Sequence, residues 1–201
     1  MNPGDGTSFS LRTKLESGHH KELTLEIAAW VGRNRRRFAE VVAFMMGTDA
    51  KLAARAAWVM SVCVEAHPEL LEPHLKDLLD HLERHGLHPA IPRNTFRVLQ
   101  FAPISGELEA RVLSMALAAL GGPVAVAVKA YAMTVLKRLA GDVPEIMAEV
   151  KLLIDEQMHD ASPAFRARAR MEFGNGGSRR YRGCPDFAES NASICRANRR
   201  G

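Results

Sequence analysis

Histidine side chains gather between residues 67 and 88, where they could bind a metal ion. The histidines of this segment are His67, His74, His81, His85 and His88. Asp77, His81 and His85 recur at steps of four, so on an α-helix they lie one turn apart on one face. Carboxylate and imidazole groups are ligands of zinc and other transition metals.

The details of this segment argue against a metal site. HLERH departs from the HExxH zinc motif, because Glu83 lies two residues after His81 and points to the opposite side of a helix. His74 and His81 would be about 10 Å apart along the axis, too far to share one ion. The pattern favours a solvated flank with His–Asp pairs. A metal site at Asp77, His81 and His85, or a pH-sensitive surface, is the alternative.

Arginine is concentrated in a run at the start of a predicted helix. The run consists of Arg33, Arg35, Arg36 and Arg37. A helix N-terminus disfavours cations, which suggests a role in binding an anion such as a nucleic-acid phosphate. A solvated face is the favoured interpretation.

A second basic group lies in the C-terminal segment 174–201. This segment contains six arginines against Asp186 and Glu189, which equals the formal net charge of +4 of the whole chain. The remaining chain is therefore neutral, which argues against a body built to bind phosphate backbones. The tail arginines most suited to nucleic acid are Arg179, Arg180 and Arg182.

Sequence motifs of catalysis are absent. The chain contains neither a GxSxG nucleophile motif nor a Gly-Lys phosphate loop. Cys63 lies among apolar residues and is expected in the core, and Cys184 and Cys195 have no histidine nearby to complete a zinc set. We expect no enzymatic activity and no cofactor.

Targeting signals are also not evident. The polar N-terminus lacks the apolar stretch of a signal peptide. The most apolar run, residues 112–128, is interrupted by Gly121-Gly122-Pro123 and is too short for a membrane span. We expect a cytoplasmic protein without membrane contact.

Charged residues recur with a long period. Basic residues are separated by 38, 36 and 37 positions and carboxylates by 38 and 38. The basic set is Arg55, Arg93, Lys129 and Arg166, and the acidic set is Glu69, Glu107 and Glu145. The basic set could grip an acidic partner. A structural ladder is favoured, because Asp49 and Asp160 each precede an arginine of the set by six residues.

Apolar residues recur at steps of three or four from about residue 20 to residue 173, which predicts an all-α chain. The expected helix pairs are His20–Val31 with Asn34–Met46, Thr48–Ala66 with Pro68–Arg84, Ala90–Ala102 with Ser105–Leu120, and two helices within Pro123–Met158. A last helix follows Ser162-Pro163. Ser105 and Asp142 are the expected N-caps of the second helices of the third and fourth pairs.

Two segments carry a family resemblance. PELLEPHLKDLLDHLERHGLHPAIPRNTFRVLQFA and PEIMAEVKLLIDEQMHDASPAFRARARM resemble HEAT repeats in their leucine-rich helix, polar turn and second helix opening near an arginine. The run 56–171 is also similar to a short bacterial HEAT-like family. The resemblance, over roughly residues 20–173, implies a right-handed α-α superhelix of about four helix pairs plus a final helix.

Three parts of the chain are expected. Residues 1–18 form a flexible leader, residues 19–173 the HEAT-like repeat domain, and residues 174–201 a basic tail. The tail is either a disordered arm or the product of a shifted reading frame.

These features predict a non-catalytic module that binds a peptide or helix of a partner protein. Contacts are expected in the second helices, around Glu69, Glu107 and Glu145, and at the matched basic positions. The alternative is nucleic-acid association through Arg33–Arg37 or the tail. The chain could be a monomer, or an apolar end face could pair two copies.

Overall fold

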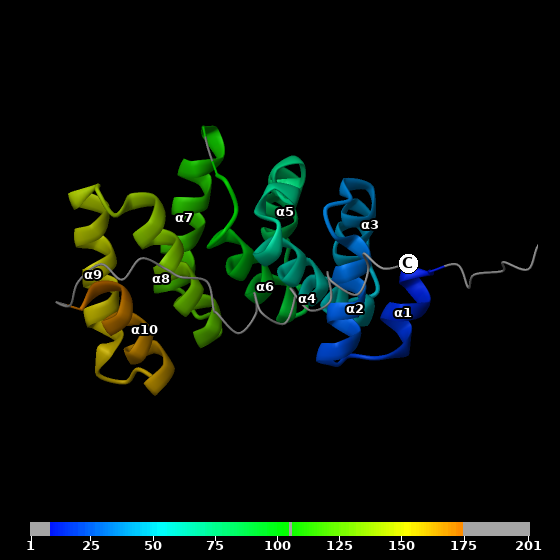
Figure 1. The fold of residues 1–201 in the computed structure, drawn as a ribbon. Helices are drawn as coiled ribbons and strands as arrows, with labels where there is room; N and C mark the ends of the chain where they lie inside the picture. Colours follow the sequence, from blue (N-terminus) through cyan, green and yellow to red (C-terminus); the bar gives the residue numbers. More distant parts are fainter. Residues whose placement is uncertain (1–8, 105, 175–201) are drawn as a thin grey trace, which may run out of the picture.

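The computed structural model describes residues 9–104 and 106–174, whose regular elements are all helices (Figure 1). The α-helices are α1 Leu11–Ser17, α2 Lys21–Val31, α3 Arg35–Met45, α4 Ala50–Ala66, α5 Leu75–Leu82, α6 Ala90–Leu99, α7 Glu107–Gly121, α8 Val126–Ala140, α9 Pro144–Met158 and α10 Pro163–Phe173. Two 3₁₀ turns, Pro68–Leu70 and Glu72–His74, precede α5. The all-α prediction is confirmed.

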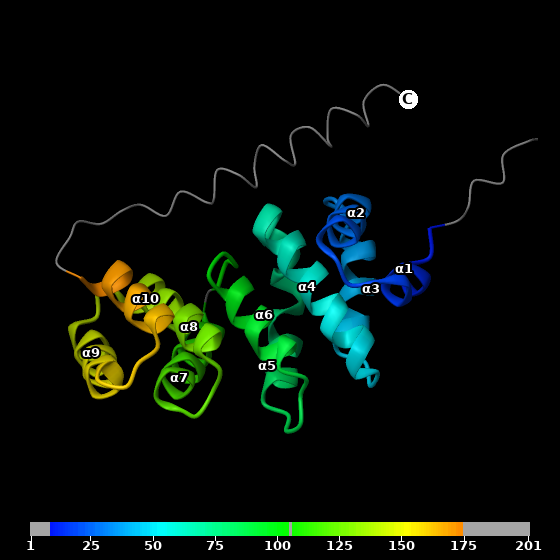
Figure 2. The same ribbon diagram turned by 90° about the horizontal axis from the view of Figure 1, so that it is seen from below.

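The helices form an elongated stack of two layers. Figure 2 shows α2, α4, α6, α8 and α10, the even layer, along one side, and α3, α5, α7 and α9, the odd layer, along the other. Each even helix packs against the next even helix, and α3 and α7 pack closely on α4 and α8. Contacts between neighbours along one direction are the mark of an α-solenoid, which confirms the predicted architecture.

Helix α4 lies at the centre of the packing. Eleven of its 17 residues are buried, because α2 and α3 pack on one side of it and α6 on another. Ala56 and Ala57 are completely buried, and their small side chains allow the neighbouring helices to approach closely. Larger side chains such as Phe38 and Met60 fill the spaces between the helices. Burial of each large apolar side chain contributes about 1.5–3 kcal/mol.

Polar side chains begin several of the helices. Asn34 Oδ1 accepts from the backbone N–H groups of Arg36 and Arg37, and Asp49 Oδ1 caps α4 in the same way. Each such cap stabilises its helix by about 1 kcal/mol. The expected cap at Asp142 is wrong: Val143 occupies the N-cap position of α9 without a side-chain bond.

The predicted start of α7 differs slightly. Ser105, its expected cap, lies outside the described residues, and Gly106 precedes the helix with φ of 62°. This φ lies in the left-handed region that glycine adopts without strain. Residues 1–8 and 175–201 also lie outside the described residues, and with them almost the whole predicted tail.

The prediction of a flexible leader over residues 1–18 is wrong for residues 11–17. These residues form α1, and Leu11 and Leu15 pack into the core at 5% and 2% exposure. Two leucines four residues apart in a polar stretch are too short a pattern to be distinguished from chance. A helix of seven residues is unstable alone, so α1 depends on its packing against the repeats.

The prediction of one long helix over Pro68–Arg84 is also wrong. Two 3₁₀ turns occupy its first half, and α5 itself has eight residues. Pro73 lacks a backbone N–H, and its ring would clash with the carbonyl of Glu69 in a continuous α-helix. The α-helix therefore begins only after the proline.

The burial of Cys63 in α4 leads to a chemical prediction. Its side chain is 2% exposed, and burial raises the pKa of the thiol from 9.0 to about 12. In a chain carrying Cys184→Ser and Cys195→Ser, Cys63 should react with iodoacetamide only as fast as the fold opens, and at once in denaturant. Mass spectrometry over time measures this; rapid alkylation of the native chain would contradict the predicted packing of α4.

Candidate interaction surface

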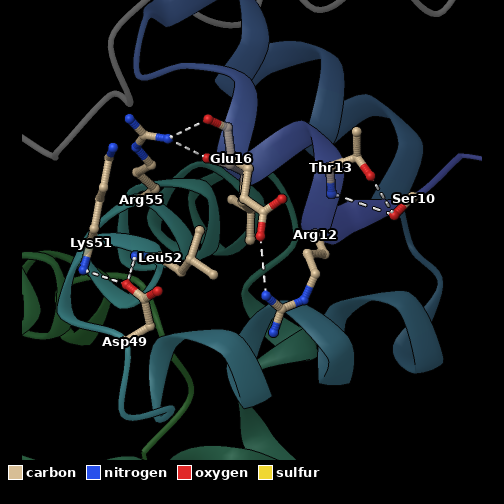
Figure 3. A network of polar contacts seen from close by, with 9 residues as sticks. Ser10, Arg12, Thr13, Glu16, Asp49, Lys51, Leu52 and Arg55 are labelled. Atoms are coloured by element: carbon tan, nitrogen blue, oxygen red, sulfur yellow. Dashed lines mark hydrogen bonds and ion pairs between the residues drawn. The ribbon is translucent and has the colours of Figure 1, made fainter.

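Arg55 holds the C-terminus of α1 against α4 (Figure 3). Its Nη1 donates to the carbonyl oxygens of Leu15 at 2.5 Å and Glu16 at 3.1 Å. These carbonyls have no partner within their own helix, so the guanidinium completes the end of α1. The expected Asp49–Arg55 pair is not formed, because the Asp49 carboxylate caps α4.

The other members of the basic set have different surroundings. Lys129 Nζ donates to Gln157 Oε1 of α9, so it links α8 to the odd layer. Asp160 Oδ1 lies 3.7 Å from His159 Nε2, and Asp160 forms no ion pair with Arg166. Within the described part of the chain, the side chains of Arg93 and Arg166 make no hydrogen bond or ion pair, and Arg93 is exposed. The basic set therefore contains two residues with structural contacts, Arg55 and Lys129, and two whose side chains have no partner among the described residues, Arg93 and Arg166.

The acidic set lies on the odd layer. Glu107 and Glu145 are exposed in the first turns of α7 and α9, where carboxylates favour the helix N-terminus. Glu69 is exposed in a 3₁₀ turn, with its Oε1 4.0 Å from His67 Nδ1. Each carboxylate opens the second segment of its helix pair. The three repeat along the stack as the spacing predicts.

The predicted histidine flank is wrong at His81. This side chain is 5% exposed, and neither ring nitrogen has a hydrogen-bond partner among the described residues. Burial lowers the pKa of His81, with the charge of Arg84 as a smaller cause. Burial likewise lowers the pKa values of His67 and His74.

The alternative metal site at Asp77, His81 and His85 is not formed. Helix α5 ends at Leu82, so His85 lies beyond the helical face that Asp77 and His81 would share. In residues 9–104 and 106–174, no group of three His, Cys, Asp or Glu side chains is placed to hold a metal ion.

One arginine of the basic run is part of an aromatic stack. Arg37 Nη1 donates to the Trp30 carbonyl at 2.7 Å, and its guanidinium lies 4.9 Å from the Trp30 ring. Phe9 stacks on the same ring with centroids 4.2 Å apart. Arg33, Arg35 and Arg36 are exposed, and their side chains make no hydrogen bond or ion pair within the described residues. Arg37 therefore has a structural role, and the other three remain available.

A shallow pocket of about 300 Å³ lies between α1 and the turn from α3 to α4. Arg12, Phe44, Thr48 and Asp49 are among its lining residues. Arg12 pairs with Glu16 at 3.0 Å and lies 5.6 Å from the Phe44 ring centroid, while Asp49 caps α4. Both charged groups of the pocket thus already stabilise the local structure.

The even layer contains polar contacts that the sequence analysis missed. Arg97 Nη2 lies 2.6 Å from Glu65 Oε2, linking α6 to α4. Arg138 Nη2 donates to the Leu99 carbonyl at 2.7 Å, linking α8 to α6. The partners are 32 and 39 residues apart, and the first separation falls short of the 36–38 period, so a search for opposite charges at that period would have missed the first pair. The backbone acceptor of the second leaves no trace in the sequence.

The last helix is joined to α8 by a similar network. Arg168 Nη1 donates to Thr134 Oγ1 at 3.0 Å and to Glu172 Oε1 at 3.2 Å. Thr134 Oγ1 in turn donates to Glu172 Oε1 at 2.6 Å. The charge of Arg168 is therefore neutralised within the chain.

Comparison with known proteins identifies the repeats. A family profile described as HEAT repeat domain matches residues 11–172. No curated protein matches the chain, and no solved structure does. None of the described helices has the length and apolar character needed to cross a membrane.

The contacts of Arg55 predict its contribution to stability. Arg55→Ala removes two charge-assisted bonds and should lower the free energy of unfolding by about 1.5–3 kcal/mol. The control is Arg93→Ala, at the matched position in α6 but without a bonded partner, which should change it by less than about 0.5 kcal/mol. Urea denaturation compares the two; equal effects would contradict the structural role of Arg55.

The burial of His81 predicts a pH dependence. The pKa of His81 in the folded chain lies below the ordinary value of 6.5, so the unfolded chain binds a proton at this residue more readily. Protonation therefore lowers the stability of the fold as the pH falls through 6.5, and has no such effect well above it. His81→Leu also removes an unsatisfied buried group, whose cost is about 1–3 kcal/mol. Chemical denaturation at several pH values should show a smaller loss of stability in acid for His81→Leu than for the original chain. His67 and His74 should leave a smaller pH dependence of the same sign in the variant. A variant whose stability depends on pH just as that of the original chain does would therefore refute the role given to His81.

Proposed function

Because this chain belongs to the HEAT repeat family, we propose that it is a cytoplasmic, non-catalytic module that binds a peptide or helix of a partner protein. Repeats of this family generally mediate protein–protein interactions. The observation that carries the proposal is the continuous stack of helix pairs, whose two layers form long surfaces.

Two rows of charged residues are the proposed contacts. Glu69, Glu107 and Glu145 form one row, on the odd layer, and are all exposed. The second row is the basic set, Arg55, Arg93, Lys129 and Arg166. Arg55 and Lys129 already have hydrogen-bond partners within the chain. They would contact a partner protein mainly through the N–H donors that these bonds do not use.

Nucleic-acid association is the second candidate function. It is favoured by the exposed Arg33, Arg35 and Arg36 at the turn between α2 and α3. Arg179, Arg180 and Arg182 would add to this charge, although they lie outside the described residues. Affinity of this kind falls steeply with salt concentration, and should be lost when these arginines are replaced by glutamine.

The test is capture of partners by the tagged full chain from native lysate, with and without nuclease. We expect a protein partner that nuclease treatment leaves bound. Glu107→Lys combined with Glu145→Lys should reduce its recovery by about tenfold, because charge reversal at a contact opposes binding. Each reversal near a helix N-terminus also costs about 0.3–1 kcal/mol, so melting curves accompany the capture.

Glu156→Lys, an exposed reversal at the other end of α9, is the control and should leave recovery unchanged. A loss of binding that merely follows a loss of stability would make Glu107 and Glu145 structural residues. Recovery of nucleic acid alone would favour the second candidate function. Failure to capture any protein would refute the proposed one.

A further inference from the structure

Positive charge on the even layer is neutralised unevenly along the stack. Arg97 of α6 pairs with Glu65 of α4, and Arg168 pairs with Glu172 within α10. Earlier along α4 and α6, a group of basic residues surrounds a tryptophan, and their contacts within the described part of the chain include no carboxylate. We call this group the anion patch; it consists of His19, Arg55, Trp58, His88 and Arg93.

Three segments bring the anion patch together. His19 comes from the turn between α1 and α2, and its ring meets the Trp58 ring edge-on, with centroids 4.9 Å apart. Arg55 precedes Trp58 by nearly one turn of α4. Arg93 lies on α6, which packs directly against α4, and His88 lies just before α6. Residues far apart in the sequence thus form one local surface.

The electrostatic environment of His19 agrees with a cationic patch. Burial lowers the pKa of His19, and the charges of Arg55, Arg93 and His88 lower it further. No carboxylate is among these causes. An anion placed there would relieve the repulsion among the cations.

Several hydrogen-bond donors of the patch are already held in place. The bonds from Arg55 Nη1 to two carbonyls fix the guanidinium, while its Nε and Nη2 make no bond among the described residues. His88 Nδ1 accepts from the Ala90 N–H at 3.1 Å, which places the proton of the neutral ring on Nε2. Donors fixed before binding reduce the entropy lost when a ligand binds.

The surroundings of the patch indicate the kind of anion. Trp58 is partly exposed and offers an apolar surface beside the cations. The positive charge does not continue along α4 and α6, because Glu65, two turns beyond Trp58, is already paired with Arg97. A continuous phosphate backbone would need such a continuous basic surface. A ligand with one or two carboxylates next to an apolar side chain matches this arrangement better than a polyphosphate does.

We infer that the anion patch binds an aspartate or glutamate side chain of a partner peptide, with an adjacent apolar side chain of that peptide packed on Trp58. The inference rests on the proposed function and specifies its partner as an acidic, partly apolar segment. Arg93 is the residue to change in a test, because its side chain is exposed and makes no hydrogen bond or ion pair within the described residues.

The test uses the full chain and a fluorescein-labelled decapeptide of Glu, Leu and Gly, followed by fluorescence anisotropy. Arg93→Gln should weaken binding by about tenfold, as loss of a charged contact does. Arg170→Gln is the control: it removes an exposed cation of α10 that belongs to neither row of proposed contacts and whose side chain has no partner among the described residues, and it should leave affinity within about twofold. NMR signals of His19 and His88 should shift on addition of the peptide to the original chain.

Four results would overturn the inference. They are no binding of the acidic peptide, equal binding of a peptide with Gln in place of Glu, equal weakening by Arg93→Gln and Arg170→Gln, and tighter binding of an oligothymidine of equal length. The proposed function is judged separately. If a captured protein partner is retained by Arg93→Gln, the module function stands and the acidic-peptide assignment fails.

Discussion

The structure depends on the fact that no helix pair of this chain can bury its own apolar surface. Helix α4 shows this most clearly: with eleven of its 17 residues buried, it needs α2, α3 and α6 around it at once. Stacking is the arrangement that satisfies every pair, since each pair covers the apolar side of the one before it. The elongated shape and the two layers both follow from this requirement (Figure 1).

A second requirement concerns the carbonyl groups at the ends of the helices, which lack partners within their own helix. Side chains from later in the sequence supply the donors. Arg55 does this for α1, Arg37 for α2, Arg138 for α6, and Gln157 for α7, through the Leu120 carbonyl at 3.0 Å. Long polar side chains at repeating positions can thus serve to bond the carbonyl groups at helix ends, as well as to contact a partner protein.

The sequence predicts the parts of the fold that local rules determine. The caps that Asn34 and Asp49 supply are not among the expected ones, whereas the apolar periodicity places most helices to within a few residues. It fails where tertiary contacts decide: α1 forms because Leu11 and Leu15 find a site on the repeats. The candidate site follows the same rule. The recurring charges are visible in the sequence, whereas the group formed by His19, Arg55 and Arg93 requires three segments to meet in space.

The nearest-neighbour packing of the even layer also has a mechanical consequence. Every strong contact joins a helix to one close by in the stack, and α1 and α10 lie towards its opposite ends. A force that pulls these ends apart acts on one interface after another, because the strong contacts among the described helices join neighbours and none of them spans the stack. The molecule should therefore lengthen by successive small steps under tension and act as a compliant spring between whatever is attached to its two ends.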